Sequence, residues 1–143
     1  MPLRLVPPIH RATHRIGLYL AALRDDGLSQ GEAHILALLA SSGPATIADL
    51  HRGLAHKRST LTSILDRLAG RGLITRDVGK DDRRTFVITP TATGRIAARR
   101  VHRHLTGLER AVAGRVSGAE ARAFIKVIAA VEDEAHRRTH ARK

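Results

Sequence analysis

The hydrophobic pattern of this chain changes its period once, and that change limits the folds open to it. Before residue 70 the apolar residues recur at helical spacing, whereas residues 73–78 and 85–89 are short runs rich in β-branched side chains. Residues 79–84 between them consist of a glycine and five charged residues. Two short strands around such a loop predict a β-hairpin with a charged tip.

Three helices are predicted between residue 29 and the hairpin. Ser29 with Glu32 and Thr46 with Asp49 have the spacing of capping boxes, in which hydroxyl and carboxylate each accept a backbone N–H of the first turn. These boxes open the first two helices. The third helix is expected over residues 58–70, with an inward face of Leu61, Ile64, Leu65 and Leu68 and an end at Gly70 or Gly72.

Further helices are expected on both sides of this region. The first covers residues 9–23 and is ended by the Asp-Asp-Gly sequence at 25–27. After the hairpin, one helix is expected to reach residue 113, with Thr89 as its N-cap and Pro90 at its first position. A third capping box, Ser117 with Glu120, opens the last helix.

The resulting order of elements is four helices, two strands and two helices, a mainly α (α+β) chain. Its central part, helix–turn–helix followed by a hairpin, is the order of a winged helix-turn-helix. A short strand at Ala45-Thr46 would complete a small three-stranded sheet.

Charge is concentrated in the middle of the chain. Of the formal net charge of +12, residues 51–104 contribute +9, with thirteen basic and four acidic residues. Such a surface attracts a polyanion such as nucleic acid, although an Arg-rich solubility surface is the alternative. The chain has no cysteine, which excludes disulfides and thiolate zinc sites and fits a cytoplasmic protein. Because no apolar run reaches the roughly 18 residues of a membrane span, no membrane partner is expected.

The helix over residues 58–70 carries the first set of candidate DNA contacts. Small hydroxyls allow a helix to approach base edges closely, and basic residues at its start can reach phosphates or guanine. The alternative is an ordinary solvated helix face. The candidates are Lys57, Arg58, Ser59, Thr60, Ser63 and Arg67.

The hairpin tip carries the second set. Arg83 and Arg84 stand where side chains can enter the narrow, electronegative minor groove. Asp81 and Asp82 beside them are unfavourable for an anionic partner, so one of them is expected to pair with an arginine and brace the loop. The alternative is a salt-bridge cluster within the loop that contacts no partner.

Two segments of the chain resemble the MarR family of bacterial regulators. They read LSQGEAHILALLA…TIADLHRGLAHKRSTLTSILDRLAGRGLITR and, through the wing, DDRRTFVITPTATG. Two departures from the family pattern concern the turn before the 58–70 helix: His56 replaces an aliphatic residue, and Lys57 replaces a small N-cap residue.

The resemblance implies a homodimer that binds double-stranded DNA at a pseudo-palindromic site. Helices within residues 9–27 and 100–138 would interlock between two chains, residues 28–99 would form the DNA-binding lobe, and 139–143 would be a flexible tail. The recognition helix, residues 58–70, would enter the major groove and the wing, residues 79–84, the minor groove. The family also implies a repressor of transcription that a small aromatic or phenolic effector releases from DNA.

Three other functions are weighed against this one. His10 and His14 have helical i, i+4 spacing and are weak metal-ligand candidates for a zinc- or other metal-responsive regulator of the same fold, although surface histidines are the simpler interpretation. A sequence-nonspecific architectural DNA-binding protein would share the basic patch. No motif of an enzyme active site is found in the sequence, so no enzyme is expected.

Overall fold

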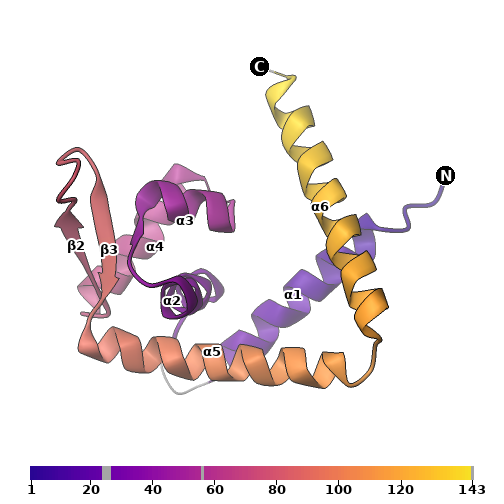
Figure 1. Cartoon of the computed structure of the whole chain (residues 1–143), viewed down its shortest axis with the longest axis horizontal. Coiled ribbons are helices and arrows are strands. Elements are labelled where there is room, and N and C mark those ends of the chain that lie inside the picture. The colour runs from indigo at the N-terminus through magenta and orange to yellow at the C-terminus, as the bar shows by residue number, and fades with distance from the viewer. Residues whose placement is uncertain (24–26, 56, 143) are drawn as a thin grey trace. The chain divides into compact units, whose positions relative to one another are not determined.

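The computed structural model describes residues 1–23, 27–55 and 57–142. Its elements, labelled in Figure 1, are α1 (Val6–Ala22), α2 (Gln30–Ser42), β1 (Ala45–Thr46), α3 (Ile47–Leu54), α4 (Arg58–Gly70), β2 (Ile74–Val78), β3 (Phe86–Pro90), α5 (Ala92–Ala113) and α6 (Gly118–His140). The predicted order and the mainly α class are confirmed. The short strand predicted at Ala45-Thr46 is present as β1.

The three strands form one antiparallel sheet in the order β1-β3-β2. The hairpin of β2 and β3 pairs Ile74 with Pro90 at its base and Val78 with Phe86 near its tip. On the other edge of β3, Ala45 pairs with Ile88 and Thr46 with Val87. Because β1 directly precedes α3, this pairing ties the hairpin to the helical part of the lobe.

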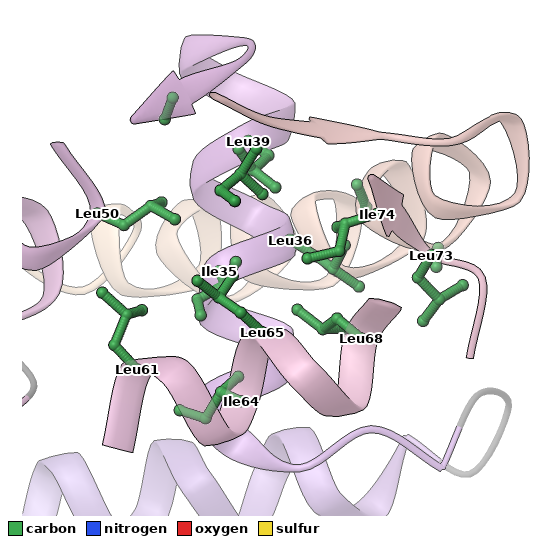
Figure 2. Packing of buried hydrophobic residues seen from close by; sticks show 14 residues of the cluster. Ile35, Leu36, Leu39, Leu50, Leu61, Ile64, Leu65, Leu68, Leu73 and Ile74 are labelled. Atoms are coloured by element: carbon green, nitrogen blue, oxygen red, sulfur yellow. The ribbon is translucent and has the colours of Figure 1, made fainter. Parts of the chain in front are cut away.

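The core lies between α2 and α4, and the sheet covers one side of it. Figure 2 shows Leu61, Ile64, Leu65 and Leu68 of α4 pointing toward α2. The side chains of Ile35, Leu36 and Leu39 meet them from α2, and Ile74 and Ile88 contribute from the strands. The predicted inward face of α4 is therefore confirmed, and the core is aliphatic throughout.

The helix starts follow the predicted capping residues with one variation. Complete capping boxes join Thr46 with Asp49 and Ser117 with Glu120. At α2, Ser29 accepts the N–H of Glu32, but the Glu32 carboxylate is directed toward α4. Of the two glycines predicted to end α4, Gly72 adopts the left-handed conformation, with φ +70°.

The predicted start of α5 is wrong by two residues. Pro90 belongs to β3, and the N-cap hydroxyl is that of Thr91, which accepts the N–H of Gly94 at 3.0 Å. The Thr91 N–H also donates to the Leu73 carbonyl at 3.0 Å, a bond that proline at this position could not make. A Cβ on Gly94 would lie 1.7 Å from the same carbonyl oxygen, so only glycine allows this approach of α5 to the hairpin.

The other ends of the helices differ slightly from expectation. Pro7 and Pro8 lie inside the first turn of α1, where a missing N–H costs nothing. The predicted stop includes Asp25 and Asp26, which lie outside the described residues, and Gly27 has φ +58°. At the other end, α6 continues through His140, two residues into the expected tail.

The chain divides into two compact units, Met1–Arg103 and His104–Lys143, with the division inside α5. The first unit contains the winged lobe and its core. The second unit consists of the end of α5 and α6, and no residue of α6 is buried. Among the described residues, no helix is long and apolar enough to cross a membrane.

Candidate nucleic-acid interface

The outward face of α4 presents the predicted contact residues to solvent. Leu61, Ile64, Leu65 and Leu68 are buried, and the predicted Arg58, Ser59, Thr60, Ser63 and Arg67 are exposed on the remaining face. The structure adds Thr62, which the sequence reasoning missed although the same helical period places it between Ser59 and Asp66. The face is a stripe of hydroxyls flanked by cationic side chains.

The turn before α4 is formed without a side-chain cap. Lys57 is the N-cap with φ −62° and ψ 149°, and its side chain makes no capping hydrogen bond. Ala55 closes α3 in the left-handed region (φ 55°), a conformation that costs energy for a residue with a Cβ. His56, the other departure from the family pattern, lies outside the described residues.

Arg67 is held by two neighbours. Its Nε donates to Glu32 Oε1 at 3.2 Å, and its Nη1 donates to Ser63 Oγ at 2.8 Å. Arg71 donates to the other Glu32 oxygen, Oε2, also at 3.2 Å. Arg67 is thus not simply a free cation on the predicted DNA-binding face, because one side of its guanidinium binds a buried carboxylate.

Two further ion pairs stiffen the lobe around this face. Asp66 of α4 accepts from Arg76 of β2 at 2.7 Å, which ties α4 to the first strand of the wing. On α3, Arg52 pairs with Asp49 of the capping box. The Thr46 backbone and hydroxyl hold the pKa of Asp49 below its ordinary value, with a smaller contribution from Arg52.

The wing loop is closed by backbone hydrogen bonds, which corrects the predicted brace. Asp82 Oδ1 accepts the backbone N–H of Arg84 at 2.9 Å, and the Asp82 carbonyl accepts the N–H of Thr85 at 3.1 Å. Within the described chain, neither Asp81 nor Asp82 forms an ion pair with an arginine of the wing. Asp82 therefore braces the loop through the main chain, which leaves the guanidinium groups of Arg83 and Arg84 exposed at the tip.

The histidines do not assemble into a ligand set in the described part of the chain. His10 and His14 lie exposed on α1, and no cluster of three or more His, Asp or Glu suited to a metal ion occurs among residues 1–23, 27–55 and 57–142. The rings of His136 and His140 lie 4.2 Å apart on α6. Among the described residues, His10 and His14 thus gain no third ligand.

A helix-turn-helix of α3 and α4 followed by a two-stranded wing defines the winged helix-turn-helix class. Residues 28–86 match the sequence model of the MarR family. Over these residues the chain is similar to the MarR family. No curated protein sequence matches the chain significantly.

Solved structures share the fold over nearly the whole chain. A MarR family regulator from Neisseria meningitidis superposes with a TM-score of 0.81 at 19% identity, covering 97% of this chain and 96% of its own. MepR from S. aureus, solved with DNA, gives 0.79 at 17% identity, covering 94% and 99%. PcaV from Streptomyces coelicolor, solved with its natural ligand, gives 0.75 at 18% identity, covering 94% and 99%.

Proposed function

We propose that the protein is a sequence-specific DNA-binding transcriptional regulator. Residues 58–70 would read the major groove, and the wing at residues 79–84 would enter the adjacent minor groove. The observation that carries the proposal is the pairing of an exposed hydroxyl-lined face on α4 with two exposed arginines at the wing tip. MepR, a structural neighbour solved with DNA, supports it by analogy of fold.

Each group has a separate physical task in this proposal. Lys57 and Arg58 would bind phosphates at the start of α4, where the helix N-terminus also favours an anion. Ser59, Thr60 and Ser63 would meet base edges, and Arg67 would contribute the part of its guanidinium that Glu32 and Ser63 leave unused. Arg83 and Arg84 would sense the width and potential of the minor groove.

The regulator would act as a homodimer in the cytoplasm. Apolar side chains stand exposed on α6, with Phe124 57%, Ile125 65% and Val127 39% accessible. Contiguous apolar surface of this kind marks an interaction site, and a two-fold dimer matches a pseudo-palindromic operator. We assign dimerisation to helices within residues 9–27 and 100–138 and DNA binding to residues 28–99.

Repression relieved by a small effector completes the proposal. BpsR from Bordetella bronchiseptica is described as regulated in DNA binding by 6-hydroxynicotinic acid, and PcaV was solved with its natural ligand. An aromatic or phenolic acid is therefore the first class of compound to screen for release of this protein from DNA.

Selection of bound fragments from genomic DNA, followed by titration of the enriched duplex, tests the function. We expect the enriched duplex to bind at least about 10³-fold more tightly than a scrambled duplex at physiological salt. Equal affinity for both duplexes would favour an architectural DNA-binding protein. No binding even at low salt would contradict DNA binding altogether.

A further inference from the structure

Glu32 is the buried charged side chain of the winged lobe, and it lies directly behind the recognition helix. Its side chain is 6% exposed, and among the described residues it is the charged residue classed as buried. Arg67 of α4 and Arg71, the C-cap residue of that helix, each donate to one of its carboxylate oxygens at 3.2 Å. Ser29 donates to Oε1 at 3.1 Å.

Helix capping does not explain this placement. In α3 and α6 the acid of the capping box accepts the backbone N–H of the N-cap residue, as the sequence pattern predicts. In α2 the same pattern occurs, but the carboxylate binds Arg67 of α4 and Arg71, the C-cap residue of α4. Burying a carboxylate costs several kcal/mol of desolvation unless hydrogen bonds and opposite charges compensate. The two arginines supply that compensation for Glu32.

The hydrogen bonds continue from Glu32 to the DNA-facing side of α4. Arg67 binds Glu32 through Nε and donates through Nη1 to Ser63 Oγ at 2.8 Å. A serine hydroxyl that accepts a hydrogen bond still has its own O–H to donate. The acceptors of the major groove are guanine N7 and O6, adenine N7 and thymine O4.

On the proposed function, we infer that Glu32 is a positioning residue for base recognition. It fixes the guanidinium of Arg67, and Arg67 in turn fixes Ser63 as a hydrogen-bond donor toward an acceptor on a base edge. Arg71 anchors the other carboxylate oxygen and also donates to the Gly27 carbonyl at 3.4 Å. Recognition at one base position therefore depends on a residue that does not touch DNA.

Glu32→Gln in the full chain tests the inference, with the selected and the scrambled duplex as probes. We expect affinity for the selected duplex to fall about tenfold, the scale of one mismatched base pair. Affinity for the scrambled duplex should change less than twofold, because the cationic groups remain. Asp77→Asn is the control, since it removes an exposed carboxylate of β2 that accepts a hydrogen bond from the Thr75 hydroxyl and belongs to neither set of proposed DNA contacts.

A double-variant cycle separates positioning from a general loss of structure. If Glu32 acts through Ser63, then Glu32→Gln and Ser63→Ala lose preference at the same base position, and the double variant loses no more than the worse single variant. If Glu32→Gln fails to fold by circular dichroism, Arg67→Lys tests the same path, because lysine keeps the charge and lacks the second donor group.

The failures are distinguishable. Additive losses in the double variant, or a base preference that Glu32→Gln or Arg67→Lys leaves intact, would overturn the inference alone. A wild-type protein that prefers no duplex would contradict the proposed function, and the inference would fall with it.

Discussion

The winged lobe buries its apolar side chains, whereas the last helix, α6, leaves its apolar side chains exposed. In the lobe, Leu36, Leu50, Leu65 and Leu68 are completely or almost completely buried. In α6 no residue is buried, and Phe124 is 57% exposed. Both regions begin helices with complete capping boxes. The same local signals therefore serve a lobe that buries its own core and a helix whose apolar face requires another surface.

The largest effect is expected from a cavity in the lobe. Leu36 has an exposed fraction of 0%, and Leu36→Ala should lower the free energy of unfolding by about 3 kcal/mol through lost contacts and the cavity left behind. Val78→Ala, at a residue 53% exposed on the wing, is the control and should cost less than about 1 kcal/mol. Chemical denaturation measures both, and equal losses would contradict the assignment of the core.

A change on α6 should leave the lobe folded and break the assembly. Phe124→Asp places a charge in the apolar surface and should weaken dimerisation about 100-fold, because a charge buried without a partner is costly. Light scattering across a dilution series measures the shift, with Phe124→Leu as the control. A dimer that tolerates the aspartate, or a wild-type chain that stays monomeric, would refute the proposed interface.

The wing arginines should affect DNA binding without affecting either unit's fold. Arg83→Ala and Arg84→Ala should each lower affinity for the selected duplex about tenfold, because each removes a cation from the minor groove. Arg115→Ala removes an exposed arginine outside the lobe and serves as the control. Fluorescence anisotropy gives the affinities; if both wing variants bind like the wild type, the wing assignment is wrong.

The smallest effect concerns the capping carboxylates. Hydrogen bonds from the Thr46 backbone and hydroxyl lower the pKa of Asp49, and those from Ser117 lower the pKa of Glu120. A carboxyl whose pKa is lower in the folded state stabilises the fold above its unfolded pKa, and that stabilisation disappears as the pH falls through the folded value.

Titration of the carboxyl carbons by NMR checks this sign. Thr46→Ala should raise the pKa of Asp49 toward its ordinary value and leave that of Glu120 unchanged. An Asp49 pKa at its ordinary value in the wild-type protein would mean that its capping hydrogen bonds are not formed in solution.

The sequence predicts most of the fold because its local signals agree with one another. Thr46, Ser117 and Gly72 mark helix ends by their own backbone chemistry, and the apolar period selects the inward face of α4. The candidate contact residues on that face could be predicted for the same reason. Exposure of Ser59 and Ser63 follows directly from the helical period.

The remaining features depend on contacts between elements that are distant in sequence. Thr89-Pro90 reads locally as a helix start, but pairing with Ile74 extends the strand to Pro90 and moves the cap to Thr91. The sequence pattern places Glu32 in a capping box, but Arg67 of α4 and Arg71, the C-cap residue of α4, bind its carboxylate. One of Asp81 and Asp82 was expected to pair with an arginine guanidinium, whereas Asp82 accepts the backbone N–H of Arg84.

Hydroxyl-radical footprinting of the selected duplex tests the central claim most directly. The account predicts two protected half-sites about one helical turn apart, each flanked by minor-groove protection that disappears in Arg84→Ala while the central protection remains. Uniform protection along the duplex, or flanking protection that survives loss of both Arg83 and Arg84, would contradict it.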